Sequence, residues 1–432
     1  MLKTWIYRDL TERDLKHICQ RPRFETKNLD TVVGDIIQQV KDNGDQAVLK
    51  YTETFDGVRP DPLLWKVRSP EEIPVSSAVR EAYQTAFENI YAFHKAQIPQ
   101  HIEVQTMPGI ICRREARPIE RVGLYIPGGT APLPSTVLML GVPSLLAGCS
   151  YRILATPPDK NGQPLPAIEL AASLTNIEHI YLSGGAQAIA AMALGTETIE
   201  KTDKIFGPGN QYVTAAKMAL QNSNALISTD LPAGPSEVMV IADSESDPAF
   251  VASDLLSQAE HGNDSPVILV SIGDQDLTLV FDALKVQLEQ LPRAEYIREA
   301  FKHSHVVQVD DTGQAIEMIN AYAPEHLIIH PDHSDEFIPH IQHAGSVFLG
   351  PWTPESAGDY ASGTNHTLPT YGYARMYSGV SVEDFMKFIT FQKLTPEGLT
   401  SLAPVVTTMA ETESLEAHKR AVTIRMERLT SS

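Results

Sequence analysis

The sequence predicts an α/β protein built on two regions of parallel β-sheet, one inserted in the other. From about residue 122 onward, short apolar runs alternate with small-residue segments of helical period, which is the pattern of βαβ units. The composition supports a folded chain, because 43% of the residues are apolar and 20% are charged. With 432 residues, the chain is long enough for about three domains.

The elements follow in order along the chain. The first 120 residues are predicted to be mainly helical, because segments 32–40 and 79–93 have an amphipathic rhythm. Apolar runs then predict buried strands at 122–126, 151–155, 179–182, 205–206, 225–228, 238–241, 267–270, 305–309, 327–329 and 346–349. Segments among them predict helices at 135–146, 186–194, 211–220 and 247–260. After about residue 380 the chain is expected to be helical again, ending in a helix over 411–429.

The charge and the cysteine content narrow the class of protein. There are 54 acidic and 34 basic residues, a net charge of −20, so a nucleic acid or an anionic membrane is an unfavourable partner. Cys19, Cys112 and Cys149 are too few and too scattered for a disulfide framework or a CxxC zinc site. Prolines and glycines interrupt the uncharged stretch 124–151, so it does not predict a membrane span. We expect a cytoplasmic protein without nucleic-acid or membrane partners.

Three glycine-rich turns each follow a predicted strand and precede a predicted helix, at 127–132, 183–188 and 207–212. None completes the Gly-x-Gly-x-x-Gly fingerprint of a dinucleotide site, and one such turn alone is ordinary βα chemistry. In a parallel sheet, however, all three would lie at the carboxyl edge, where ligands bind in open α/β sheets. Together they leave two interpretations open, a phosphate- or dinucleotide-binding site and plain turns.

Two segments pair polar side chains that suit metal binding and proton transfer. Gln258 and His261 are three residues apart at a helix end, so they share one face and can supply two metal ligands. A histidine that interacts only with its helix C-terminus is the alternative. Glu325 and His326 stand just before an apolar strand, where a carboxylate can activate water beside a proton-shuttling imidazole. The alternative there is a polar residue pair at the start of a strand.

A third segment, 356–366, is expected to be a long loop of small residues. Long loops in compact domains are often functional, and this one carries Asp359, a candidate third metal ligand, and His366. An ordinary surface loop is the alternative. His418, on the last helix, is by itself a surface histidine. Solvent exposure is also expected for His303, His305, His330, His333, His340 and His343.

At these residues the chain resembles the histidinol dehydrogenase family, over nearly its whole length. The motifs that carry the resemblance lie at 123–129, 184–188, 206–210, 233–237, 258–261, 324–327, 358–360 and 364–366. It implies two incomplete Rossmann-like α/β domains with small helical segments at both ends. The implied divisions are a helical segment over 1–22, a larger domain with the metal and catalytic residues over 23–121 and 237–378, an inserted NAD-contacting domain over 122–236, and a helical tail over 379–432 that reaches the partner subunit.

The resemblance also implies the chemistry. Members of the family oxidise L-histidinol to L-histidinal and then to L-histidine, in the last steps of histidine biosynthesis, with two NAD+ and one zinc ion per subunit. Glu325 would activate water, and His326 would accept the proton of the alcohol. In a homodimer with shared active sites, the zinc ligands would be Gln258, His261, Asp359 and His418 of the partner subunit.

Further residues match positions that contact ligands in the family. For the substrate they are Ser236, His366 and Glu413, beside Gln258, His261, His326, Asp359 and His418. For NAD+ they are Tyr125, Gln187 and Asn210, in or beside the three glycine-rich turns. Glu413 and His418 are five residues apart, which is roughly 140° of rotation on one unbroken helix. Both can serve one site only if a helix starts between them or sits end-on to it.

Other functions fit parts of the sequence. A zinc hydrolase could use Glu325 to activate water, but the sequence has no His-Glu-x-x-His helix and the glycine-rich turns would have no purpose. A paralogous dehydrogenase acting on another amino alcohol and a non-catalytic binding protein with a structural metal are two further alternatives. Cys112 and Cys149 suggest a thiol mechanism, but the small and apolar neighbours of Cys149 favour a buried, inert thiol.

Overall fold

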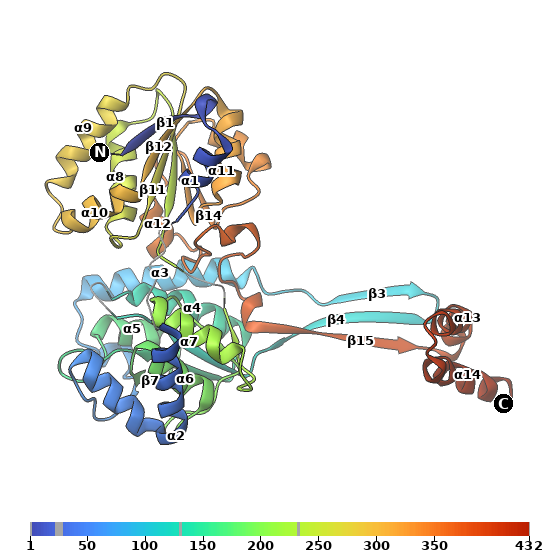
Figure 1. Cartoon of the computed structure of the whole chain (residues 1–432). Helices are drawn as coiled ribbons and strands as arrows, with labels where there is room; N and C mark the ends of the chain where they lie inside the picture. The colour runs from blue at the N-terminus through green and yellow to red at the C-terminus, as the bar shows by residue number, and fades with distance from the viewer. Residues whose placement is uncertain (1, 22–28, 129–131, 231–233, 432) are drawn as a thin grey trace.

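Two α/β bodies and a long arm make up the molecule (Figure 1). The computed structural model describes residues 2–21, 29–128, 132–230 and 234–431. Parts of two motifs, residues 129–131 and 233, therefore lie outside the described residues. The predicted α/β class is confirmed. Among the described helices, none is long and apolar enough to cross a membrane.

The first sheet contains the strands that lead into the glycine-rich turns. Its six described strands run in the order β2-β7-β6-β5-β8-β9 and are parallel except for the pair β2–β7. The strands are β2 (Leu64–Lys66), β5 (Arg121–Tyr125), β6 (Tyr151–Thr156), β7 (His179–Leu182), β8 (Lys204–Phe206) and β9 (Ser228–Thr229). One face packs against α2 (Leu29–Asp56), α6 (Gly185–Leu194) and α7 (Gln211–Gln221). The other face packs against α3 (Ser77–Lys95), α4 (Pro134–Ala147) and α5 (Pro166–Leu174).

The second sheet is parallel throughout, in the order β1-β12-β11-β10-β13-β14. Its strands are β1 (Lys3–Ile6), β10 (Val238–Ala242), β11 (Val267–Ile272), β12 (His305–Val309), β13 (His326–Ile329) and β14 (Ser346–Leu349). One face packs against α8 (Pro248–Ala259), α9 (Leu277–Leu288) and α10 (Ala294–Ala300). The other face packs against α1 (Glu12–Ile18) and α11 (Thr312–Tyr322). A short helix, α12 (Glu355–Tyr360), follows β14 and contacts α8.

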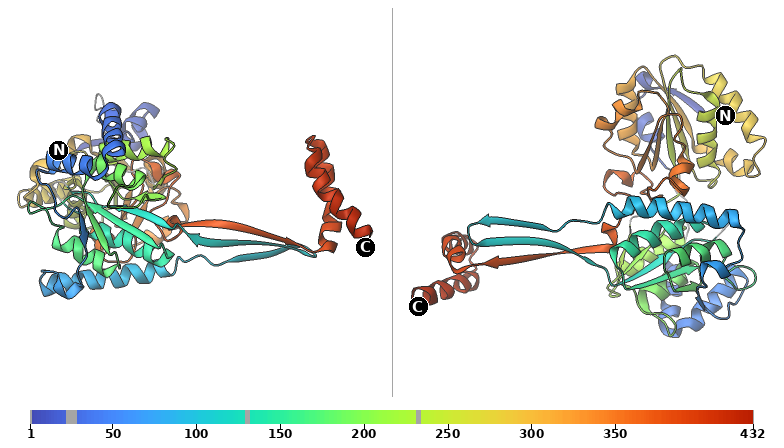
Figure 2. Two further views of the ribbon diagram at one scale, coloured as in Figure 1. Left: turned by 90° about the horizontal axis from the view of Figure 1, so that it is seen from below. Right: turned by 180° about the vertical axis from the view of Figure 1, so that it is seen from behind.

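The arm is a three-stranded antiparallel sheet of β3 (Ile102–Met107), β4 (Ile110–Pro118) and β15 (Met386–Leu394). Helices α13 (Pro396–Thr412) and α14 (Glu416–Thr430) form its tip, and they lie away from both bodies in every view (Figures 1 and 2). All six β3 residues are exposed. The first 120 residues and the tail after residue 380 thus contain strands where mainly helices were predicted. In the described part of the chain, no helix packs along a face of this sheet, so the sequence there lacks the alternation of strands and helices that identified the others.

Each predicted buried strand overlaps an observed one, and the predicted helices correspond to α4, α6, α7 and α8. Asp247 begins α8 as expected, because its carboxylate accepts a hydrogen bond from the backbone N–H of Ala249. Short 3₁₀ helices join other elements, at Tyr7–Asp9, Pro70–Glu72, Phe301–His303, Ser334–His340, Tyr373–Arg375 and Glu383–Phe385.

The sheets divide the chain differently from the expected domain boundaries. Segment 23–121 was assigned with 237–378, yet β2 pairs with β7, and the buried faces of α2 and α3 complete the cores of the first sheet. Segment 1–22 was expected to be helical, but β1 pairs with β12 at the edge of the second sheet before α1 begins. In the order of the sequence, therefore, the described chain from α2 to β9 is inserted between β1 and β10 of the second sheet.

Candidate active site

The acid–base pair stands at the amino edge of the second sheet. Glu325 directly precedes β13, His326 begins it, and the Glu325 Oε2 and His326 Nδ1 atoms are 3.7 Å apart. Ser236 and Glu237 directly precede the neighbouring strand β10, and the Glu237 N–H donates to Glu325 Oε2 at 2.9 Å. Both side chains of the pair are buried, at 4% and 3% exposure. The sheet register thus holds the carboxylate in place through a backbone donor.

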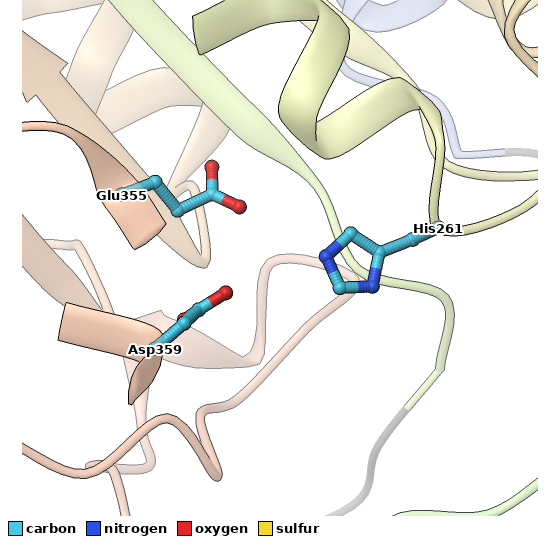
Figure 3. Close-up of side chains that lie close together, drawn as sticks. All are labelled: His261, Glu355 and Asp359. Atoms are coloured by element: carbon cyan, nitrogen blue, oxygen red, sulfur yellow. The ribbon is translucent and has the colours of Figure 1, made fainter. Parts of the chain in front are cut away.

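A cluster of side chains that could hold a metal ion lies beside this pair. His261, Glu355 and Asp359 each bring a ligand atom within 4.8 Å of the others. Figure 3 shows the two carboxylates reaching from α12, and His261 from just beyond the end of α8, toward one shared space. Asp359 also joins the cluster to the acid–base pair, because its Oδ1 lies 3.3 Å from Nε2 of His326. That nitrogen is buried and has no well-aligned hydrogen-bond partner.

Gln258 completes the cluster from the last turn of α8, where it is fully buried. In the amide orientation that satisfies its neighbours, its nitrogen donates to Glu355 Oε1 at 3.1 Å, to Glu355 Oε2 at 3.3 Å and to His326 Nδ1 at 3.2 Å. Imidazole nitrogen, carboxylate oxygen and amide oxygen are donors that zinc accepts. The orphaned nitrogen of His326 and this donor set together fit a divalent cation held among Gln258, His261 and Asp359.

His366 connects the cluster to the first body. Its Nδ1 lies 2.7 Å from the backbone oxygen of Asp359, and its Nε2 lies 3.0 Å from the hydroxyl of Thr136 on α4. The expected long loop over 356–366 is wrong in its first part, since Asp359 lies on α12. A helix of only six residues, with one buried glycine in it, has too little periodicity to be recognised.

The expected cofactor residues line one cleft of about 830 Å³. Tyr125, Gln187 and Asn210 stand at the carboxyl ends of β5, β7 and β8, and the cleft extends from them to His261. The Gly185 N–H donates to the Tyr125 hydroxyl at 3.0 Å, and Asn210 caps α7 through its side-chain oxygen. Among the described residues, the buried side-chain oxygen of Gln187 has no hydrogen-bond partner, so this part of the cleft wall offers an acceptor.

Comparison with known proteins agrees with this geometry. A family model described as histidinol dehydrogenase matches residues 19–426. The chloroplastic histidinol dehydrogenase of Arabidopsis thaliana is 52% identical, over 98% of this chain and 91% of that protein. The histidinol dehydrogenase of Vibrio parahaemolyticus is 49% identical over the full length of both chains. The chain belongs to the histidinol dehydrogenase family.

A solved structure of the family extends the likeness to three dimensions. The crystal structure of histidinol dehydrogenase from Elizabethkingia anophelis superposes with a TM-score of 0.94, at 48% identity and 99% coverage of both chains. Membership in the family makes this chain an oxidoreductase.

The titration of the acid–base pair reflects its burial among carboxylates. Burial alone would lower the pKa of His326, but the nearby carboxylates, that of Glu355 first, outweigh burial and raise this pKa to about 10. Burial also raises the pKa of Glu325 well above its usual range, although His326 and the Glu237 N–H oppose the rise. Without a cation, the pair therefore binds protons tightly.

The pKa values of the other side chains in the cluster shift in different directions. Burial raises the pKa of Glu355 to about 8. Burial acts on Asp359 in the same sense, but the close approach of His326, 3.3 Å away, prevails and lowers its pKa. Burial lowers the pKa values of His261 and His366. Both imidazoles are thus kept in the neutral form that metal coordination requires.

Two residues implied by the family resemblance lie outside this site within one chain. Glu413 is the C-cap of α13, and His418 lies in the first turn of α14, both exposed at the tip of the arm (Figure 2). The single predicted helix over 411–429 is wrong, because Ser414, with φ 58°, separates two helices. A helix does start between Glu413 and His418, which is one arrangement that lets both face one site.

Sequence reasoning missed Glu355, Asp254 and the burial of His330. His330 was expected to face solvent but is only 2% exposed, because its Nε2 pairs with Asp254 at 2.8 Å. His305, also expected in solvent, is 7% exposed. The one signal for Glu355 was its position four residues before Asp359, which places both on one face of a helix.

The cysteines stay away from the cleft. Cys149 is buried as expected, and burial raises its pKa to about 12, which disfavours a reactive thiolate. Cys112 lies on β4 of the arm. Neither lines the cleft.

Proposed function

We propose that this chain catalyses the oxidation of L-histidinol through L-histidinal to L-histidine, with two NAD+ and one zinc ion per subunit. The observation that best supports this proposal is one continuous cleft, which runs from the three glycine-rich turns to His261 of the cluster that could hold a metal. The family to which the chain belongs has the same activity in its name. The free cysteines suit a reaction in the cytoplasm.

The cleft would hold NAD+, which would supply the hydride acceptor for both steps. Tyr125, Gln187 and Asn210 would bind it at the carboxyl edge of the first sheet, where α6 and α7 begin. Helix N-termini with their free backbone N–H groups favour the negative charge of a pyrophosphate. The cleft volume of about 830 Å³ is within the ordinary range for cofactor sites.

The metal cluster would hold the substrate. Gln258, His261 and Asp359, with His418 of the partner subunit, would bind zinc, which would orient the imidazole and amine of the substrate as a template. Ser236, His366 and Glu413 of the partner subunit would contact the substrate around it. His366 is already fixed at both nitrogens, by Asp359 and by Thr136, so its orientation is set before substrate binds.

His326 would act in the alcohol step. Its Nε2 faces Asp359 and the centre of the site. To accept the hydroxyl proton there as the first hydride leaves, the neutral ring would carry its own proton on Nδ1, beside Glu325, and the Gln258 amide would then donate to Glu355 alone. The carboxylates that raise its pKa lose much of their effect when a cation neutralises them, so the imidazole can be free of its proton near neutrality. Asp359 then stabilises the imidazolium that forms.

Glu325 would act in the aldehyde step. Burial raises the affinity of its carboxylate for a proton, while His326 and the N–H of Glu237, 2.9 Å from one oxygen, favour the ionised form that can act as a base. It would remove a proton from the water that adds to the aldehyde, and the second hydride leaves from the hydrate. The closed, buried position of the pair keeps the aldehyde from bulk water.

The reaction is tested by measuring NADH formed from L-histidinol and NAD+, before and after chelation. Two NADH for each histidinol, lost on chelation and restored by zinc, would support the proposal. One NADH for each substrate molecule would indicate a simple alcohol dehydrogenase and remove the role of Glu325. No NADH from folded, zinc-loaded protein would contradict the proposal and turn attention to another amino alcohol or to hydrolysis.

A homodimer with shared sites is tested by complementation. Glu413 and His418 lie at the tip of an arm that projects from the body (Figures 1 and 2), so in a dimer they would serve the partner's cluster. His418→Ala and His261→Ala chains should each be inactive alone. Their mixture should recover part of the activity, since one of the two sites regains both histidines. No recovery in a verified heterodimer would contradict sharing.

A further inference from the structure

Glu355 is the member of the metal-binding cluster that neither the motifs nor the proposed ligand set includes. It is the first residue of α12, only 1% exposed, and one helical turn before Asp359. Figure 3 shows that its carboxylate points toward the same space as Asp359 and His261. A buried carboxylate needs partners that compensate for the loss of water, so its contacts indicate its role.

The partner of Glu355 is the side chain of Gln258. The amide nitrogen donates to both carboxylate oxygens, at 3.1 and 3.3 Å, and the glutamine is completely buried. A cation bound in the cluster would favour the ionised form of this carboxylate, and hydrogen bonds to an ionised acceptor are about twice as strong as those between neutral groups. The pair therefore fixes the amide across the gap between α8 and α12.

Fixing the nitrogen of Gln258 also fixes its oxygen. The two atoms branch from one carbon, so an amide whose nitrogen faces Glu355 turns its carbonyl oxygen the other way. Only the oxygen can bind a cation, since the NH₂ group is a donor without a free electron pair. An amide without such an anchor could present either atom to the metal.

We propose that Glu355 is a positioning residue that selects the amide orientation of Gln258 and so presents its carbonyl oxygen to the metal. This inference rests on the zinc site of the proposed function. The carboxylate of Glu355 faces the amide nitrogen of Gln258 with both oxygens, and this contact assigns it to Gln258; the test below separates that role from direct ligation. The arrangement is the outer-shell support that metal ligands commonly have.

The test compares Glu355→Asp in two backgrounds of the full-length protein, with Gln258 intact and with Gln258→Leu. Aspartate keeps the negative charge but is one methylene shorter, so it withdraws from the amide. Zinc affinity is measured by competition with a chromophoric chelator. We expect Glu355→Asp to weaken zinc binding about 10- to 100-fold when Gln258 is present. In the Gln258→Leu background, the same change should alter affinity less than about threefold, because there is no amide left to orient.

Two results would overturn the inference. An equal loss in both backgrounds would make Glu355 a direct ligand, and no loss in either would make it a bystander. Glu169→Gln is the matched control, because Glu169 is equally buried but is paired with Arg68 on the first body. It should lower the unfolding temperature and leave zinc affinity unchanged, which separates general destabilisation from the specific effect.

The same measurements separate this inference from the proposed function. If the unmodified protein binds no zinc, or oxidises histidinol equally well after chelation, the proposed function fails first. If it binds zinc and oxidises histidinol, and Glu355→Asp still binds zinc normally, only the role of Glu355 is lost.

Discussion

The two parallel sheets present opposite edges to the active site. The first contributes its carboxyl edge, where Tyr125 ends β5 and glycine turns follow β7 and β8. The second contributes its amino edge, where Glu237 precedes β10 and Glu325 precedes β13. The same βαβ architecture thus supplies two different surfaces, one of small neutral residues and one of buried charged groups.

The direction of the helices explains why the edge of the first sheet suits an anionic cofactor and the edge of the second suits a cation. Helices α6 and α7 begin beside the cleft, so the positive ends of their dipoles suit an anionic cofactor. Helix α8 ends beside it, so the negative end of its dipole, next to Gln258 and His261, suits a cation. Reversing one sheet relative to the other lets a single site attract both kinds of charge.

The largest expected effect is on the reaction rate, and it comes from the amino edge of the second sheet with its buried charged groups. His326→Gln should slow oxidation of histidinol by about 10²- to 10⁴-fold, the usual contribution of a general base. Glu325→Gln should slow oxidation of supplied histidinal by a similar factor and affect the alcohol step less. Rates with each substrate, measured separately, check this split. Equal losses in both steps for Glu325→Gln would show that the two residues do not have separate roles.

The next largest effect is on stability, and it concerns the buried ion pair at the same edge of the second sheet. Arg21 forms two hydrogen bonds of 2.8 Å with the fully buried carboxylate of Glu237. Arg21→Gln should lower the free energy of unfolding by about 3–5 kcal/mol, because Glu237 is left buried without its counter-ion. Urea denaturation measures it, and the double variant Arg21→Gln, Glu237→Gln should recover part of the loss. A double variant as unstable as the single one would contradict this cause.

The carboxyl edge of the first sheet should instead be sensitive to added side-chain volume. Gly207 has φ +124°, and an added Cβ would overlap the carbonyl oxygen of Tyr125. Gly207→Ala should cost about 3 kcal/mol of stability and raise the KM for NAD+, while zinc affinity stays unchanged. Gly273→Ala, after β11, is the control: its φ is +69° but no atom lies within 4 Å of the new Cβ, so strain alone should cost about 1 kcal/mol. Equal losses for both would mean that the close approach to Tyr125 is unimportant.

The smallest effect is a pH dependence at the amino end of β12. Burial lowers the pKa of His305 from 6.5 to about 4, and its Nδ1 accepts a hydrogen bond from the Trp5 indole. As pH falls below 6.5, the unfolded chain takes up this proton first, so stability should fall between pH 6.5 and 4. At pH 5.5, one unit below the ordinary value, this group should have lowered the stability by about 1.4 kcal/mol. Unfolding midpoints of His305→Gln should depend less on pH across this window, and an unchanged slope would assign the proton uptake to other groups.

The strands that are buried between helices were the elements predicted most accurately from the sequence. Strands such as β10 and β11 are apolar on both faces and alternate with helices, so they were found at nearly their true positions. β1 and β2 were missed because they are short edge strands whose partners lie far along the chain. The arm strands were missed because no helix covers them.

The site was predictable where a single segment carried the signal. Gln258 with His261, and Glu325 with His326, are neighbours in sequence, and the structure brings them together with Asp359. Glu355 and Asp254 gave no comparable signal, since a lone acidic residue usually faces solvent. Their burial depends on partners in other segments, namely Gln258 and His330.

The pairing of β1 with β12 has a consequence for the order in which the protein is made. Trp5 and His305 touch across these strands, although 300 residues separate them. At about 5–20 residues per second, the ribosome needs roughly 15 to 60 seconds to produce the partner of the first strand. The whole first sheet, which ends at Thr229, emerges during that interval. Strand β1 is therefore made long before its partner β12, and it can take its place at the edge of the second sheet only after β12 has been made.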